Sequence, residues 1–168
     1  MNNEKKGIKM MNIKRLVTQF RNTIETARDA GEFDDDFLFI RFPHGCCGDA
    51  CELLAQFLLD HGISSYYICG TYYVDEFENI QTHAWLLVDN KTIIDITGDQ
   101  FKNNRYLLNY NKSIHVGLED DFHRLFEIHE NQVRKNLGID NLGHNCQPRL
   151  FKLYRTILEF IDEDFINE

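Results

Sequence analysis

The feature that most constrains this chain is an apolar stripe at helical spacing that leads directly into strand-like runs. The stripe comprises Ala50, Leu53, Leu54, Phe57 and Leu58. Spacings of three and four residues place these side chains on one face of a helix, which must then pack against another element. Gly62 is a typical helix end, and the run that follows over 66–74 is rich in aromatic residues, as strands are. This order predicts a helix packed on a sheet.

The remaining elements extend this pattern on both sides. Strand-like runs follow at 83–88, 92–96 and 113–116, and 37–42 is expected to be extended. Helical spacing occurs at 13–27, from Leu118 to near Gly138, and from Pro148 onward. Because the strands cluster between helices and do not alternate with them, the sequence predicts an α+β fold with an antiparallel sheet.

Length and charge limit the classes of function. The chain has 168 residues, which suits a single domain over 11–168 after a disordered tail over 1–10. Its 27 acidic residues outnumber 18 Lys and Arg, for a net charge of -9. Binding to phosphates requires local positive potential, so nucleic acid is not expected as a partner, and a neutral or basic protein suits the charge better.

Cysteine usage and the N-terminus point to a compartment. The five cysteines lack the regular spacing of a disulfide framework, and residues 1–10 lack the apolar core of a secretory signal. Apolar runs fall short of the roughly 18 residues needed to span a bilayer. We therefore expect a reduced, cytoplasmic chain without a membrane partner, and leave export by a dedicated secretion system open.

Chemistry is indicated where the apolar helix begins. Cys47 lies at the start of that helix, where the helix dipole favours a thiolate. His83 opens one predicted strand, and Asp95 lies near the end of the next. A two-residue turn would place His83 and Asp95 on opposite faces of the sheet, so we expect a three-residue loop over 89–91, or an equivalent bulge, that pairs Val88 with Thr92. His83 and Asp95 would then lie diagonally on the same face of the sheet, within reach of each other.

These segments together resemble the transglutaminase-like superfamily, a branch of the papain-like cysteine enzymes. Residues 45–51 read Gly-Cys-Cys-Gly-Asp-Ala-Cys and match the start of the family's nucleophile helix, with Cys51 where the family has a small residue. His-Ala-Trp at 83–85 and Asp-Ile-Thr at 95–97 match two further motifs. The resemblance covers 45–101, about a third of the chain, and the flanking helices match no pattern we can name.

The resemblance implies a fold, a reaction and roles for three residues. The fold is papain-like, with the nucleophile helix packed on an antiparallel sheet and additional flanking helices. Cys47 is the implied nucleophile, His83 the general base and acid, and Asp95 the carboxylate that orients the imidazole. The implied reaction is acyl transfer on an amide of a protein or peptide through a Cys47 thioester. Hydrolysis, as in a cysteine peptidase or a glutamine deamidase, ranks before amine transfer, and no cofactor or metal is required.

Alternatives remain at several positions. Cys46 competes with Cys47, although the spacing to Gly62-Ile63 favours Cys47, and Asp99 competes with Asp95. The Cys47 N–H is a natural donor to an oxyanion because it opens a helix. Further side chains at the cleft could supply the second donor, gate the nucleophile loop or form a wall. The second-donor candidates are Arg41, Gln81 and Gln100, His44 is the candidate gate, and Trp85 is the candidate wall.

Two other classes of function compete with the enzyme. One is a non-enzymatic relative whose cleft grips a peptide. The other is a zinc protein, but the available ligands lack the paired spacing of structural zinc. These ligands are His44, Cys46, Cys47, Cys51, His144 and Cys146. Cys51 and Cys69 are expected in the core, and His123 and His129 on the surface. The physiological substrate and the oligomeric state stay open.

Overall fold

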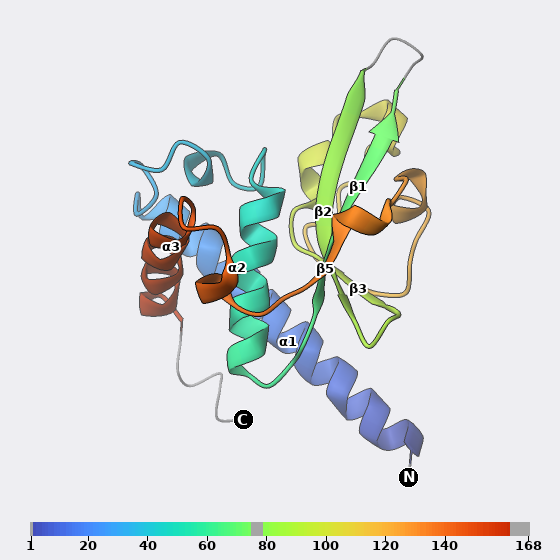
Figure 1. Ribbon diagram of the computed structural model, residues 1–168, viewed down its shortest axis with the longest axis horizontal. Coiled ribbons are helices and arrows are strands. Elements are labelled where there is room, and N and C mark those ends of the chain that lie inside the picture. Colours follow the sequence, from blue (N-terminus) through green and yellow to red (C-terminus); the bar gives the residue numbers. More distant parts are fainter. Residues whose placement is uncertain (1, 75–78, 162–168) are drawn as a thin grey trace.

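The computed structural model describes residues 2–74 and 79–161, with side chains from residue 10 onward (Figure 1). Three α-helices in this part of the chain are α1 (Asn2–Asp29), α2 (Cys47–Asp60) and α3 (Gln147–Glu159). Together with the sheet they confirm the α+β class. None of the described helices combines the length and apolar character needed to cross a bilayer.

The described strands form one antiparallel sheet in the order β4-β3-β2-β1-β5. β1 (Tyr66–Tyr73) and β2 (Ile80–Val88) are its long central strands, and β3 (Thr92–Asp95) pairs with β2. The edges are β4 (His115–Gly117) and β5 (Val133–Lys135). The four strands predicted from the sequence are therefore present, whereas β5 was not predicted.

The hairpin between β2 and β3 has the predicted register. Val88 pairs with Thr92 across a three-residue loop, in which Asp89 and Asn90 have φ of 52° and 57°. Asn and Asp tolerate this left-handed conformation better than most residues. Because side chains alternate between faces along a strand, the odd loop places His83 and Asp95 on the same face of the sheet.

α2 lies between the sheet and the other two helices (Figure 1). Its apolar stripe is buried, as the sequence predicts. The Phe57 ring stacks on the Phe20 ring of α1, with the ring centroids 4.9 Å apart. The helix ends in a Schellman motif, in which Gly62 at φ 74° lets the Ile63 N–H reach the Leu58 carbonyl at 2.8 Å. This C-terminal cap fixes where α2 ends, and Cys47 lies at the opposite end of the helix.

Alternation along β2 divides the apolar side chains between two clusters. Ala84, Leu86 and Val88 belong to the main core, which includes the helices. Trp85 belongs to a second cluster, with Phe122 and Phe126 from the chain after β4. The sheet therefore has apolar packing on both faces, and the His83 ring lies within 6 Å of aromatic rings of the second cluster.

Two stretches differ from their predicted structure near the N-terminal side. The helix predicted from residue 13 begins at Asn2, so the predicted tail is largely helical, because Lys and Glu extend a helix without any apolar pattern. The stretch 37–42 is not extended but contains a 3-10 turn at Phe39–Arg41. The Asp36 carboxylate starts this turn by accepting the N–H of Leu38 and Phe39 at 3.1 and 2.9 Å.

The helix predicted from Leu118 to near Gly138 is also wrong. The stretch contains short 3-10 turns and β5 instead. Its backbone groups at Glu127 pair with Thr71 of β1 at 2.8 and 2.9 Å. Phe122 and Phe126 are both buried in the second cluster, so their four-residue spacing reflects this burial and not a helix.

Gly70 of β1 provides a test of the second cluster. A Cβ at this position would lie 2.5 Å from the Phe126 Cβ and 2.8 Å from Trp85 Cη2. We expect Gly70→Ala to lower the free energy of unfolding by about 1–3 kcal/mol because the site is already filled. Gly143→Ala is the matched control, since its Cβ meets nothing within 4 Å. Urea denaturation of both variants measures the difference, and equal stabilities would contradict the packing described.

Candidate active site

The thiol of Cys47 lies where α2 meets the sheet. Cys47 is the first residue of α2, preceded by Gly45 at a φ of 73°. The His83 side chain and the Ala84 backbone N–H lie close enough to the sulfur for hydrogen bonding to them to lower the pKa of the thiol. The start of one helix and the middle of one strand thus hold the thiol from two sides.

The imidazole of His83 is held by Asp95. His83 Nε2 lies 2.8 Å from Asp95 Oδ2, and the two side chains are 0% and 1% exposed. Because Nε2 is engaged by the carboxylate, the contact with the thiol falls to Nδ1. The structure therefore brings the three sequence-predicted residues together in the order thiol, imidazole, carboxylate, which is the arrangement of a nucleophile, a base and an orienting group.

Burial and charge act against each other in this set. Burial favours neutral His83, but the neighbouring Asp95 carboxylate outweighs burial and raises the pKa of His83 to about 9. Burial likewise opposes ionisation of Cys47, but the hydrogen bond and charge of His83 lower the pKa of the thiol. Both shifts favour a thiolate beside an imidazolium.

The neighbouring thiol of Cys46 has the opposite environment. It is only 2% exposed, and burial, followed by the charge of Cys47, raises its pKa to about 12. A thiol held neutral is a poor nucleophile. The two adjacent cysteines therefore differ in environment. Of the two, Cys47 is the one whose thiol is influenced by the His83 imidazole.

Asp95 has two further partners, and one of them was missed from the sequence. Thr97 donates its backbone N–H to Asp95 Oδ1 at 2.8 Å, and His123 Nε2 lies 3.3 Å from Asp95 Oδ2. His123 is expected on the surface from the sequence, but its side chain is fully buried. The sequence does contain a signal for a buried His123, because Asp120 lies three residues earlier and this spacing suits a contact across a turn. In the structure, His123 Nδ1 lies 2.7 Å from Asp120 Oδ1.

Asp99 does not compete with Asp95 in the structure. Its carboxylate forms a bidentate pair with Arg21 of α1, at 3.0 and 2.9 Å. The same guanidinium is also paired with Glu25 and with the backbone carbonyl of Ile96. Asp99 therefore ties the segment after β3 to α1, and its contact is structural.

The other predicted cleft residues divide into two groups. Gln100 reaches the site: its Nε2 lies 3.3 Å from His83 Nδ1, and its Oε1 accepts the Gly45 N–H at 3.4 Å. Trp85 is buried with its ring 5.8 Å from the His83 ring, so it packs behind the imidazole. The remaining candidates have exposed side chains away from the imidazole and sulfur contacts just described. These are Arg41, His44 and Gln81.

The zinc ligands considered from the sequence do not gather. Among the described residues, the metal-ligating side chains that lie within 4.8 Å of one another are His115, Asp120 and His123. Cys51 is buried in the main core as expected, and Cys69 is half-buried. The sequence-based set is therefore replaced by a different cluster, which lies beside Asp95.

Comparison of the chain with protein-family models, with curated proteins and with solved structures finds no match. The resemblance to the transglutaminase-like superfamily therefore rests on the motifs alone.

The buried pair makes stability depend on pH. The pKa of His83 is raised from 6.5 to about 9, so the stability it contributes is fully present below pH 6.5 and is lost as pH rises through 9. The pKa of Asp95 is lowered from 3.8, because the charge of His83 and the hydrogen bonds of both histidines outweigh its burial. We expect Asp95→Asn to cost about 3 kcal/mol at pH 6 and distinctly less at pH 9.5, as measured by urea denaturation.

Asp99→Asn is the matched control for this experiment. It breaks a partly buried pair with Arg21, and although burial acts against the charged form, the hydrogen bonds and charges of Asp99 and Glu25 raise the pKa of Arg21 above its usual value. Arg21 stays charged throughout, so the cost of Asp99→Asn should be equal at pH 6 and pH 9.5. A cost of Asp95→Asn that is also independent of pH would contradict the charged pair.

Proposed function

We propose that this chain is a cysteine enzyme that transfers an acyl group from an amide of a protein or peptide, with hydrolysis as its reaction. The observation that carries the proposal is the continuous contact of Cys47, His83 and Asp95 at the start of α2. A thiol core residue would need neither a buried imidazole nor a buried carboxylate behind it, since each charged group is costly to bury. The motifs that resemble the transglutaminase-like superfamily contribute the same three residues and suggest a papain-like architecture.

The proposed reaction begins with the Cys47 thiolate. Its sulfur attacks the amide carbonyl carbon and forms a C–S bond, while the carbonyl oxygen takes the negative charge. The tetrahedral species collapses as the C–N bond breaks, and His83 gives its proton to the departing amine. Water then attacks the thioester as His83 takes one of its protons, which releases the acid and restores the thiolate beside the imidazolium.

The environment of the site suits this sequence of steps. Asp95 fixes the ring through Nε2, so Nδ1 carries the transferred proton and faces the sulfur. The Cys47 N–H, in the first turn of α2, is free of an intrahelical partner by position and can donate to the oxyanion. The Gln100 amide near His83 Nδ1 is our proposed second donor, because it is the only cleft candidate that reaches the imidazole in the described part of the chain.

A pocket lies beside the first turns of α2, directly after Cys47 in the chain. Its lining includes Gly48, Tyr67 and Leu142, together with Arg134 of β5. The Tyr67 hydroxyl lies 3.3 Å from the position of a Cβ on Gly48, so a side chain at this position would press against that hydroxyl. Its lining combines charged and apolar side chains, among them Glu52, Lys135 and Leu150, and we propose it as a place for part of a peptide substrate.

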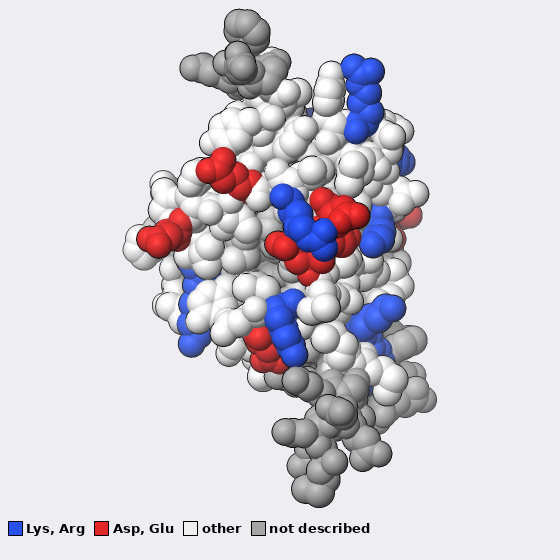
Figure 2. All heavy atoms as spheres, turned by 90° about the vertical axis from the view of Figure 1, so that its right-hand side faces the viewer, with Lys and Arg blue, Asp and Glu red and all other residues white. Residues whose placement is uncertain are grey.

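Surface charge agrees with a protein or peptide substrate. On the face in Figure 2, basic and acidic side chains meet in a mixed central group, and much of the described surface around them is uncharged. An extended positive stripe, which a nucleic acid would require, is not visible among the described residues of that face. Recognition there would rest on shape and hydrogen bonds more than on one sign of charge.

Alkylation tests the nucleophile without knowledge of the substrate. Because the pKa of Cys47 is lowered by His83 despite burial, iodoacetamide at pH 6.5 should label Cys47 before Cys69 and Cys146, which are also half-buried. His83→Gln should slow labelling of Cys47 by at least about tenfold, and peptide mass spectrometry gives each rate. The two other cysteines are internal controls whose rates should not change. Equal labelling of all three in the wild type would refute the assignment of Cys47.

Trapping tests the reaction. Cell lysate is incubated with the protein and quenched with hydroxylamine, which releases acyl groups from a thioester, and Cys47→Ala is the control. We expect hydroxamates that depend on Cys47, together with new peptide termini or new glutamates at glutamine positions. Incorporation of amines in their place would assign amine transfer. Equal products from wild type and Cys47→Ala would leave the peptide-binding relative as the better description.

A further inference from the structure

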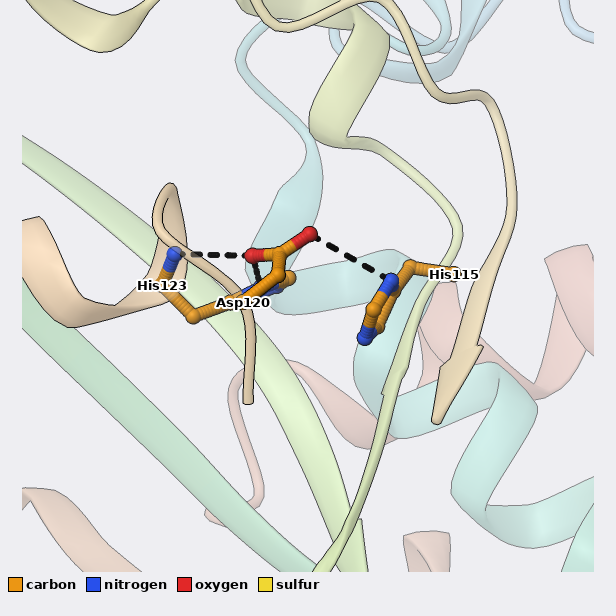
Figure 3. Close-up of side chains that lie close together, drawn as sticks. All are labelled: His115, Asp120 and His123. Atoms are coloured by element: carbon orange, nitrogen blue, oxygen red, sulfur yellow. Dashed lines mark hydrogen bonds and ion pairs between the residues drawn. The ribbon is translucent and has the colours of Figure 1, made fainter. Parts of the chain in front are cut away.

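A second histidine and a second carboxylate lie directly behind the proposed catalytic set. Figure 3 shows the Asp120 carboxylate between the rings of His115 and His123. Asp120 Oδ1 lies 2.7 Å from His123 Nδ1, and Asp120 Oδ2 lies 3.4 Å from His115 Nδ1. The Asp120 Oδ1 also accepts the His123 backbone N–H at 3.2 Å. Asp120 therefore anchors His123 through both its ring and its backbone.

The other nitrogen of the same ring faces the catalytic carboxylate. His123 Nε2 lies 3.3 Å from Asp95 Oδ2, the oxygen that also binds His83 Nε2 at 2.8 Å. Although burial acts against ionisation of both acids, their hydrogen bonds and charged partners lower the pKa of Asp95 and of Asp120. Both are therefore acceptors, and each nitrogen of the His123 ring lies beside one of them; a ring with a proton on Nε2 donates to Asp95, and one with protons on both nitrogens donates to both carboxylates.

The surroundings of His123 fix the orientation of the ring. Trp85, Tyr110 and Phe122 contact it edge to face, with centroids 5.1, 5.9 and 5.1 Å away. The Tyr110 hydroxyl donates to Asp120 Oδ2 at 2.9 Å. A fully buried imidazole with packed faces and an anchored far side has little freedom, so the direction of its Nε2–H bond is set by the fold.

The charged and titratable groups that face His123 come from three segments. Asp95 belongs to β3, Asp120 precedes the 3-10 turn His123–Leu125, and His115 belongs to β4 with its ring 5.0 Å away. The Lys112 ammonium lies 3.3 Å from Asp120 Oδ2. His115 Nε2 lies 2.9 Å from the Leu118 carbonyl oxygen, to which it can donate, and burial lowers the pKa of His115.

The same cluster has the residue types of a metal site, but its contacts favour a hydrogen-bond network. His123 Nδ1 and Asp120 Oδ1 are already in direct contact at 2.7 Å, a separation at which no ion fits between them. Asp120 Oδ2 already has a hydroxyl and an ammonium as partners. The charge that a metal ion would neutralise is thus already compensated by protein groups.

We propose that His123 is a positioning residue, which donates its Nε2–H to Asp95 and holds that carboxylate in line with His83. This role rests on the proposed function of Cys47, His83 and Asp95. Without the His123 Nε2–H, the only remaining donor to Asp95 besides His83 in the described contacts is Thr97, which binds Oδ1. The Asp95 carboxylate can then turn away from the His83 ring. The His83 imidazolium would then be less stabilised, and the Cys47 thiolate would form only at higher pH.

Two substitutions separate this role from a merely structural one. The amide nitrogen of Gln can take the place of His Nε2, whereas that of Asn lies near the place of Nδ1. His123→Gln therefore keeps a donor toward Asp95, and His123→Asn keeps only a group toward Asp120. The rate of Cys47 alkylation is measured from pH 4 to pH 8, and the NMR resonance of the His83 Nε2–H proton is recorded for each variant.

We expect His123→Gln to keep the wild-type low-pH limb and the downfield His83 proton. His123→Asn should move the limb upward by about one pH unit, which lowers the rate about tenfold along the limb, and should lose that resonance. His115→Gln removes the ring that pairs with Asp120 but keeps the backbone pairing of this position with Asp95 in the β3–β4 ladder, and should leave both readouts unchanged. If His123→Asn fails to fold, Asp120→Asn keeps the buried ring but loosens its anchor, and should shift the limb in the same direction by a smaller amount.

The outcomes distinguish this proposal from the proposed function. Identical limbs and identical His83 resonances in the Gln and Asn variants, or in the wild type and Asp120→Asn, would overturn the role of His123. A wild-type Cys47 that reacts no faster than Cys146 would count against the proposed nucleophile. In that case the His83 resonance still reports whether His123 holds Asp95, because it depends on the histidine–carboxylate contact and not on the thiol.

Discussion

A buried carboxylate, that of Asp95, is the constraint on which the rest of the structure depends. A charge at 1% exposure is tolerable only if it is paired and hydrogen-bonded from several directions. Its donors come from three separate segments: His83 of β2, Thr97 after β3 and His123 after β4. Satisfying this one group therefore fixes the hairpin register, the turn after β3 and the path of the chain that covers the second cluster.

The position of the thiol follows from the packing of α2. The apolar stripe of that helix fixes its rotation against the sheet, and the Schellman motif at Gly62 fixes where it ends. Cys47, as its first residue, is thereby brought to the middle of β2, beside Ala84 and His83. Cys46, one residue earlier, is turned into the main core. A change of one position along the helix separates a thiol that burial keeps neutral from one that the imidazole ionises.

The sequence predicts the parts of the fold in which a local pattern and a tertiary contact agree. The stripe of α2, the odd loop between Val88 and Thr92, and the approach of His83 to Asp95 all follow from spacing and parity. The prediction fails where burial imitates a helical repeat, as with Phe122 and Phe126, whose backbone pairs with β1 instead. The same error concealed His123, because a solvated helix gave no reason to bring that ring to Asp95.

Aromatic rings surround His83 and enclose the side of the imidazole that faces Asp95. Phe101, Phe122, Phe126 and Trp85 have ring centroids 5.1–5.8 Å from the imidazole. They keep water from the Asp95 side, where low polarity strengthens the charged hydrogen bonds. Nδ1 is left facing the sulfur, at the half-buried start of α2, and the Gln100 amide, in the 3-10 turn after β3. The apolar packing therefore encloses the Nε2 side of the imidazole, where Asp95 lies, and leaves Nδ1 as the nitrogen on the side of the Cys47 thiol.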